Sequence, residues 1–314
     1  MKILSKLLTY FFCLVILLIL GYLALNYYPD IPVENLKAQY TNEYSQFVEV
    51  DGMQVHYQRK GQGHPLVLVH GFSGHVWNWR EWMEHLPSDF ELIAMDLPGF
   101  GLTGPHPDGD YSTQMSVDFL DQFLTKIGVD TFHLAGNSMG GGIGWAYTLA
   151  HPERVKKLVL IDASGYPKKD SKTIAGFKIL QYPILHPLIT KVTPKSILEK
   201  SLAGTYVDQA YANEEEVNLY HNMLRRSGNR QVLIDRMKVP RKDKSHLIKN
   251  IKNPTLILWG KEDIIISVEN AYLFQKDIEG AQLIVYDQVG HLPMDEVGER
   301  SAEDVRRFLN LQAN

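Results

Sequence analysis

A serine stands between two glycines in the stretch Gly136-Asn137-Ser138-Met139-Gly140. The run 131–135 before it has the apolar pattern of a strand, and the run that continues to Ala150 has the pattern of a helix. A serine on such a turn is held out of the sheet at a helix N-terminus, where the peptide dipoles favour developing negative charge. The flanking glycines are needed because a Cβ there would collide with the neighbouring strand and helix. The spacing therefore predicts that Ser138 is a nucleophile.

Ser138 needs partners, because a serine hydroxyl at its own pKa is a weak nucleophile. An imidazole must take its proton, and a carboxylate must fix the tautomer of that imidazole and stabilise its protonated form. We expect His291 to be the base, since it follows a strand and a glycine in a loop before a final helix. Asp263 follows the apolar run 255–259 and is the expected acid. Asp162, at the end of the preceding strand, remains the alternative acid.

The elements that would position these residues alternate between apolar strands and helical stretches. Continuously apolar runs predict strands buried on both faces, as in a parallel sheet covered by helices. An alternating pattern on either side of Asp51-Gly52 predicts a hairpin. The predicted strands lie at 47–50, 53–57, 65–69, 91–95, 131–135, 155–161, 255–259 and 281–286. They indicate an α/β fold, a doubly wound and mostly parallel sheet of eight strands.

A long interval between residues 165 and 253 carries no signal of a buried strand. It is rich in helical pieces, at 173–184, 194–202, 214–226 and 231–238. Structureless loops of this length are rare inside a domain, so we expect a helical cap over residues 166–246. The apolar residues of 177–185 either face the acyl region of a membrane or close a pocket, and the sequence leaves both open.

The N-terminal segment is apolar enough to enter a membrane. Residues 7–25 are almost wholly apolar, after Lys2 and Lys6, and are nearly long enough to cross a bilayer. We expect an uncleaved single-pass anchor over 1–28, with the N-terminus cytoplasmic and the rest outside the cytoplasm, in the periplasm of a bacterium. A cleaved signal peptide is the rival interpretation. A connector, 29–46, and a globular domain, 47–314, would follow.

Other sites are not expected. The stretch Gly99-Phe100-Gly101-Leu102-Thr103-Gly104 has the spacing of a dinucleotide-binding motif, but the prolines and glycine that follow forbid the helix that such a motif must open. No metal-binding motif is present, so we expect neither a metal nor a cofactor, and no nucleic-acid partner. The single cysteine, Cys13, excludes an intrachain disulfide. Eight histidines are expected to be core or surface residues, namely His56, His85, His106, His133, His151, His186, His221 and His246.

Taken in order, these motifs resemble those of the α/β-hydrolase family over roughly residues 47 to 312. Besides the serine turn, the resemblance rests on five stretches, His70-Gly71-Phe72, Asp96-Leu97-Pro98-Gly99-Phe100-Gly101, His151-Pro152-Glu153-Arg154-Val155, Trp259-Gly260-Lys261-Glu262-Asp263 and Gly290-His291. It implies that the backbone amides of Phe72 and Met139 form the oxyanion hole. It also implies that His70 braces its loop rather than transferring protons.

The resemblance implies an esterase or lipase that forms an acyl-serine intermediate, acting on an apolar ester or lipid such as a monoacylglycerol. Hydrolases of carbon–carbon bonds in ring-cleavage products share the serine turn. They usually carry Trp after the catalytic histidine, whereas Leu292-Pro293-Met294 follows here and is more similar to monoacylglycerol lipases. Dehalogenases and epoxide hydrolases of this fold use Asp as the nucleophile, so Ser138 counts against both activities. A non-catalytic binding protein on the same scaffold is the third alternative.

Overall fold

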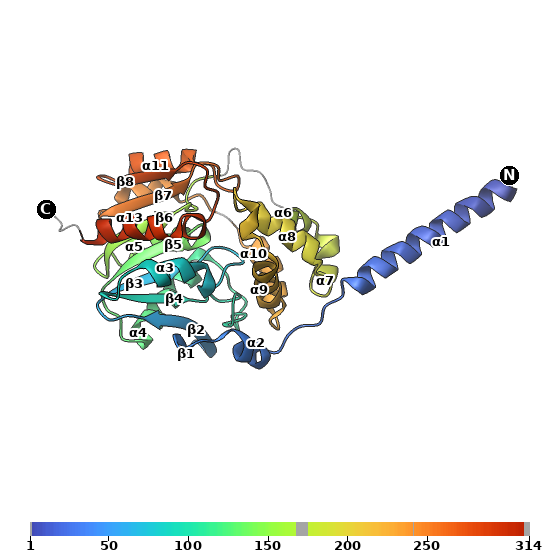
Figure 1. The fold of residues 1–314 in the computed structure, drawn as a ribbon, viewed down its shortest axis with the longest axis horizontal. Helices are drawn as coiled ribbons and strands as arrows, with labels where there is room; N and C mark the ends of the chain where they lie inside the picture. The colour runs from blue at the N-terminus through green and yellow to red at the C-terminus, as the bar shows by residue number, and fades with distance from the viewer. Residues whose placement is uncertain (1, 168–174, 241, 311–314) are drawn as a thin grey trace.

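Eight strands form one sheet in the computed structural model, which describes residues 2–167, 175–240 and 242–310 (Figure 1). The strands are β1 (Ser45–Val50), β2 (Met53–Lys60), β3 (His64–Val69), β4 (Phe90–Met95), β5 (Phe132–Asn137), β6 (Val155–Ile161), β7 (Thr255–Gly260) and β8 (Gln282–Tyr286). Their order across the sheet is β1-β2-β4-β3-β5-β6-β7-β8. β2 pairs antiparallel with β1 and β4, and all other neighbours are parallel. The predicted mostly parallel sheet is confirmed.

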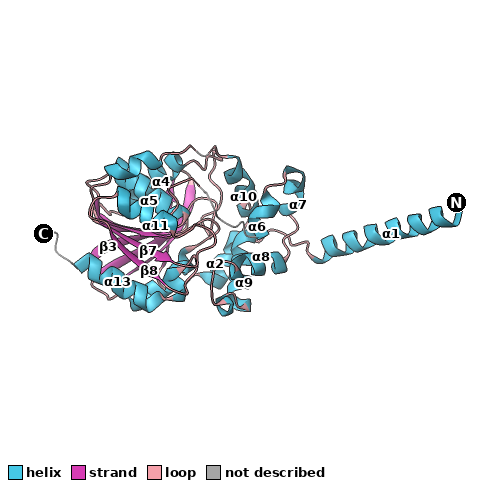
Figure 2. Cartoon of the chain, turned by 90° about the horizontal axis from the view of Figure 1, so that it is seen from above, coloured by secondary structure: helices cyan, strands magenta, loops and turns pink. Residues whose placement is uncertain are grey.

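Helices cover both faces of the sheet (Figure 2). One face carries α4 (Thr113–Lys126), α5 (Met139–Ala150) and α11 (Glu269–Asp277), and the other carries α3 (Arg80–His85), α12 (Pro293–Glu296) and α13 (Gly298–Asn310), with the short 3-10 helix η1 (Val76–Trp79). Successive residues of a strand point to opposite faces. In β3, Val67 and Val69 therefore join the first apolar core, while Leu66 and Leu68 join the second. This double burial explains why the strand sequences are continuously apolar.

The insertion between β6 and β7 is helical and lies between the sheet and the N-terminal helix in Figure 1. It contains α6 (Ala175–Leu180), η2 (Pro183–Leu185), α7 (His186–Ile189), α8 (Lys195–Ala203), η3 (Gln209–Tyr211), α9 (Glu214–Arg225), α10 (Asn229–Lys238) and η4 (Ser245–Asn250). Local sequence sets the boundaries of α9. Asn213 accepts a hydrogen bond from the amide of Glu216 (3.0 Å), and Gly228, with a φ of 92°, turns the chain into α10. The first predicted helical piece starts at residue 173, which lies outside the described residues.

A single helix of the described residues has the length and composition to cross a membrane, α1 (Lys2–Leu25). It projects away from the rest of the molecule in both views, and none of its residues is buried (Figures 1 and 2). Length and composition fit an anchor and a signal sequence equally.

The segment after α1 is more than the polar connector that the sequence indicated. It contains α2 (Val33–Tyr40), whose Leu36 is buried. Residues 26–31, here called the strap, are bound to the cap. The amide of Tyr28 donates to the carbonyl of Lys191 (3.0 Å), and the amide of Ile31 donates to the carbonyl of Arg225 (2.8 Å). The strap therefore fixes the end of α1 against the cap helices.

Candidate active site

Ser138 stands at a strained turn between β5 and α5. Its φ of 55° and ψ of −116° are unusual for a residue with a side chain, and such strain is typical of functional positions. A Cβ on Gly136 would lie 2.4 Å from the carbonyl oxygen of Gly140, and one on Gly140 would lie 2.0 Å from that of Val69. The two glycines are thus required because strand and helix approach so closely here.

His291 is held in the loop between β8 and α12 by a carboxylate. Its Nδ1 lies 2.7 Å from Oδ2 of Asp263, and both side chains are almost completely buried. The other oxygen of Asp263 accepts hydrogen bonds from the amides of Ile265 (2.7 Å) and Ile266 (3.1 Å). These bonds fix the carboxylate, which accepts a hydrogen bond from Nδ1–H of His291 and so leaves Nε2 as the ring nitrogen available to a nucleophile. Of the two candidate acids, Asp263 is the one that binds the histidine.

Two backbone contacts also position His291, and the sequence analysis identified neither. The side-chain amide of Asn137 donates to the carbonyl of His291 (3.1 Å), and the amide of His291 donates to the carbonyl of Thr205 in the cap (2.7 Å). A Cβ on Gly290 would lie 2.4 Å from that same carbonyl oxygen, which explains the glycine before the histidine. Asn137 had a signal, its place beside Ser138, whereas nothing in the sequence distinguished Thr205.

Ser138 and His291 both line one cavity of about 360 Å³. No hydrogen bond between described residues joins the Ser138 hydroxyl to His291, and in free enzymes this contact often tightens only when substrate binds. Most of the remaining wall is apolar. It comes from the cap, with Ile179, Leu180, Leu185, Leu188, Ile189 and Val192, and from the last turns of α1, with Tyr22 and Leu23.

The loop after β3 lies against the serine turn. A Cβ on Gly71 would be 3.1 Å from Cβ of Ser138, and the next residue, Phe72, lines the cavity. Met139 is the first residue of α5, on the other side of Ser138. Nδ1 of His70 donates to the carbonyl of Gly71 (2.7 Å), and its Nε2 accepts from the amide of Leu97 (3.0 Å). Burial lowers the pKa of His70, so the neutral ring braces the loop as expected.

Asp162 lies beside Asp263 and His291, although it does not bind the imidazole. One ligand-type atom each from Asp162, Asp263 and His291 lies within 4.8 Å of the others. Carboxylates and imidazoles at this distance can also bind a divalent metal. Here, however, Nδ1 of His291 and both oxygens of Asp263 already take part in hydrogen bonds, so the cluster is accounted for without an ion.

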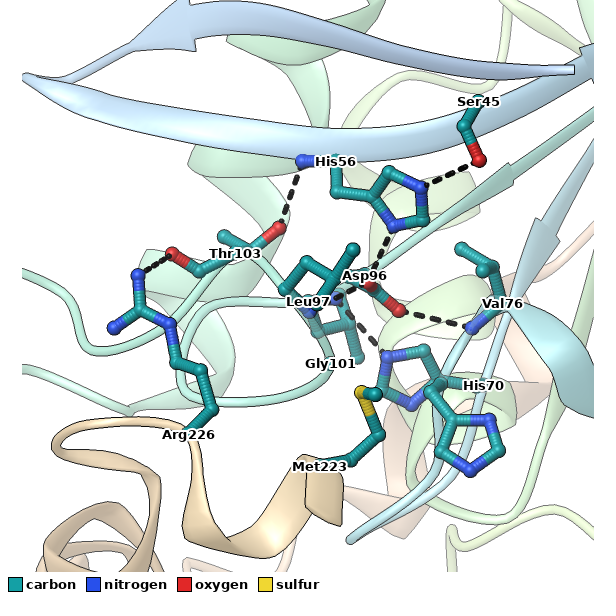
Figure 3. A network of polar contacts seen from close by, with 12 residues as sticks. Ser45, His56, His70, Val76, Asp96, Leu97, Gly101, Thr103, Met223 and Arg226 are labelled. Atoms are coloured by element: carbon teal, nitrogen blue, oxygen red, sulfur yellow. Dashed lines mark hydrogen bonds and ion pairs between the residues drawn. The ribbon is translucent and has the colours of Figure 1, made fainter. Parts of the chain in front are cut away.

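The glycine-rich loop 99–104 surrounds a second acid, Asp96, in a buried polar network (Figure 3). A Cβ on Gly101 would lie 2.1 Å from the carboxylate of Asp96, which accepts hydrogen bonds from the amides of Val76 and Leu102 (both 2.9 Å). Asp96 also binds Nδ1 of His56 (2.7 Å). Burial opposes the charge of Asp96, but His56 and these bonds outweigh it and hold the pKa of Asp96 below its usual value. Between this loop and α4 the described chain forms no helix, so the loop is not a dinucleotide-binding motif. Its glycines allow the tight turn around Asp96 instead.

Comparison with known proteins places the chain among hydrolases. The family model described as alpha/beta hydrolase fold matches residues 64–180. Lipase 1 of Psychrobacter immobilis is 30% identical over 79% of this chain and 78% of its own length. Monoacylglycerol lipase abhd6-A of Xenopus laevis is 29% identical over 80% and 77%. A 2-hydroxymuconate semialdehyde hydrolase of Pseudomonas sp. strain CF600 is 28% identical over 82% and 91%.

A solved structure is also similar over almost the whole chain. It is that of a membrane phospholipase A described as a bacterial virulence factor. The match has a TM-score of 0.69 and 25% sequence identity, and covers 99% of this chain and 98% of the other. The similarity therefore takes in nearly all of the sequence, including most of the N-terminal segment.

Proposed function

The chain belongs to the α/β-hydrolase fold family, and we propose that it is a serine carboxylester hydrolase that acts on lipids or other apolar esters, with monoacylglycerols as candidate substrates. Ser138 attacks the ester carbonyl while His291 takes its proton, and Asp263 stabilises the imidazolium that forms. The amides of Phe72 and Met139 bind the oxyanion. Protonated His291 then gives its proton to the leaving alcohol. His291 next takes a proton from a water molecule, which hydrolyses the acyl-serine.

One observation carries the substrate class: the cavity that contains Ser138 and His291 has an apolar wall shared by the cap and α1. A wall of aliphatic side chains matches an acyl chain, whose burial contributes about 0.8 kcal/mol per CH₂ group. Outside the cavity, Tyr182 and Ile184 of the same cap segment remain exposed, at 60% and 86%. The described part of 177–185 thus supports both interpretations of its apolar residues, because some line the pocket and others face outward.

We further propose that α1 remains attached as a membrane anchor, with the globular domain outside the cytoplasm. Cleavage before Pro29 would remove Tyr22 and Leu23 from the cavity wall and Tyr28 from the strap. If α1 spans a bilayer, the strap keeps the mouth of the cavity at the lipid surface, where an acyl chain can enter directly. The similarity to a membrane phospholipase A, which covers 99% of this chain, supports the anchor.

Carbon–carbon bond hydrolysis is the second candidate, because two relatives of that class are 28% and 27% identical over 82% and 85% of the chain. The charge of the cavity favours esters. Among the described residues that line it, Arg230 is the one with a permanent charge. Its guanidinium is already bound to Asp30 (2.5 Å) and to the hydroxyl of Thr193 (3.0 Å). A neutral acyl chain therefore suits this cavity better than an acidic ring-cleavage product.

The substrate class is tested with full-length protein in detergent on p-nitrophenyl butyrate, p-nitrophenyl palmitate, a monoacylglycerol and a vinylogous diketone. We expect hydrolysis of the esters and little of the diketone. Leu23→Trp should lower kcat/KM for the palmitate several-fold and leave the butyrate unchanged, because the larger side chain narrows the apolar wall. Leu18→Trp, on an exposed part of α1, is the matched control. Preference for the diketone would overturn the proposal.

The topology is tested separately. A reporter fused after Asn314 should be active outside the cytoplasm, and full-length protein should stay with membranes after a high-salt wash. Salt does not remove an apolar helix from a bilayer, because the forces that hold it are not electrostatic. Release by salt, or a mature N-terminus near Pro29, would contradict the anchor.

A further inference from the structure

Two carboxyl groups lie next to each other behind His291, and the triad uses one of them. Asp162 ends its strand with a φ of 43°, and its side chain is completely buried. Its Oδ1 accepts a hydrogen bond from the amide of Gly260 (3.1 Å). Among the described residues, its Oδ2 has no hydrogen-bond partner. An ionised carboxylate with one bare oxygen in a buried site is strongly unfavourable.

The environments of the two carboxyl groups differ in a way that decides which of them is charged. Asp263 accepts three hydrogen bonds, from two amides and from His291, and such bonds stabilise an anion. Asp162 accepts one. Burial, followed by the charge of Asp263, raises the pKa of Asp162 well above its usual value. Among the described residues, the ionisable groups that interact with Asp162 are Asp263, His291, Glu296 and Tyr286, and none of these is a permanent cation that would offset a charge on Asp162.

We propose that Asp162 is a positioning residue that stays protonated during turnover and donates its Oδ2 proton to Asp263. The pair then holds one proton and one negative charge, as paired carboxyl groups at close distance do. The hydrogen bond satisfies the otherwise bare oxygen of Asp162 and adds a fourth bond to Asp263. Asp263 is thereby fixed in the orientation that serves His291, and a second negative charge is kept away from the imidazole. The catalytic consequence rests on the proposed function, whereas the protonation state does not.

The protonation state is measured directly by infrared spectroscopy of the full-length protein at neutral pH. The wild type should show the C=O band of a protonated carboxyl group, and Asp162→Asn should lack it. Asp162→Asn is the conservative variant, because asparagine tolerates a positive φ and keeps a neutral donor. Failure to lose the band in a folded Asp162→Asn protein would overturn the proposal whether or not the protein is an esterase.

The positioning role is tested by the pH profile of ester hydrolysis. Asp162→Asn replaces one neutral group by another, so the acid limb of kcat/KM, which reports His291, should stay within about 0.3 pH unit. If Asp162 were ionised, the same change would remove an anion near His291 and lower that limb by about 1 to 3 units. Asp162→Gly fits the backbone but has no donor, and should lower kcat about tenfold with little change in KM. Equal activity of the Gly and Asn variants, or loss of wild-type activity on treatment with a chelator, would contradict the assignment.

Discussion

Two sets of serine, histidine and aspartate lie in this molecule, and they differ in what surrounds them. In the first, His291 binds Asp263, and Ser138 stands on the strained turn at the wall of the cavity. In the second, Nε2 of His56 lies 3.1 Å from the hydroxyl of Ser45, and its Nδ1 lies 2.7 Å from Asp96 (Figure 3). By hydrogen bonds alone, the second set is the more complete triad.

The second set lies outside the apolar cavity. The ring of His56 packs between Phe47, at 5.0 Å, and Trp77, at 5.5 Å, and none of the three polar residues lines the cavity. Ser45 lies at the start of β1 without the close helix N-terminus that faces Ser138. Residue types and hydrogen bonds therefore do not identify a catalytic triad by themselves. The first set differs in its strained serine, in the position of that serine at the N-terminus of α5 and in its place at the wall of an apolar cavity.

The largest expected difference between the two sets is in the serines. Ser138→Ala should lower kcat/KM on p-nitrophenyl esters by about 10⁴-fold or more, because the nucleophile is lost while the fold is kept. Ser45→Ala should stay within about twofold of wild type. Comparable losses in the two variants, with both folded, would remove the distinction.

Substitution of the two aspartates should affect different properties, catalysis for Asp263 and stability for Asp96. Asp263→Asn should lower kcat by about 10⁴-fold near neutral pH, because His291 would take the wrong tautomer. Asp96→Asn should instead cost about 3 to 5 kcal/mol in free energy of unfolding, because it breaks a buried pair. Denaturant unfolding and steady-state kinetics of both variants check this. An inactive but fully stable Asp96→Asn protein would place Asp96 in the catalytic set.

A smaller effect is expected in the pH dependence of stability. The folded state holds the pKa of Asp96 below its usual value, so it favours the anion. This contribution is fully present above the unfolded pKa of about 4 and is lost as the pH falls through the folded pKa. The free energy of unfolding should therefore fall more steeply with acidification below about pH 4 in wild type than in Asp96→Asn. Parallel curves would show that Asp96 is not the group responsible.

The sequence predicted the first set far better than the second. The strands could be predicted because burial on both faces demands continuous apolar runs. The turn at Ser138 could be predicted because strand and helix approach so closely there that only glycine fits on either side of it. Ser45, His56 and Asp96 meet because β1, β2 and β4 pair across the sheet, and no local pattern encodes that meeting. His56, which the sequence assigns to the core or the surface, is in the core.

Long-range packing also explains why the sequence does not predict the contacts of the strap or the proximity of Asp162 to Asp263. The sequence of residues 29–46 predicts only a polar connector, because Leu36 is the buried residue of α2 and the rest of that helix carries little apolar signal. The strap is held through backbone atoms, which any sequence can supply. Asp162 and Asp263 were weighed as alternatives, since each follows a strand, whereas parallel pairing of β6 with β7 brings both to the same place.

The central claim is that Ser138, and not Ser45, is the nucleophile. Its most direct test is covalent labelling of the full-length protein with a fluorophosphonate, followed by mass spectrometry of the digested protein. The account predicts one label per chain on the peptide that contains Ser138, with loss of esterase activity in step with labelling, and no label on the Ser138→Ala variant. A label on Ser45, or undiminished labelling of Ser138→Ala, would contradict it.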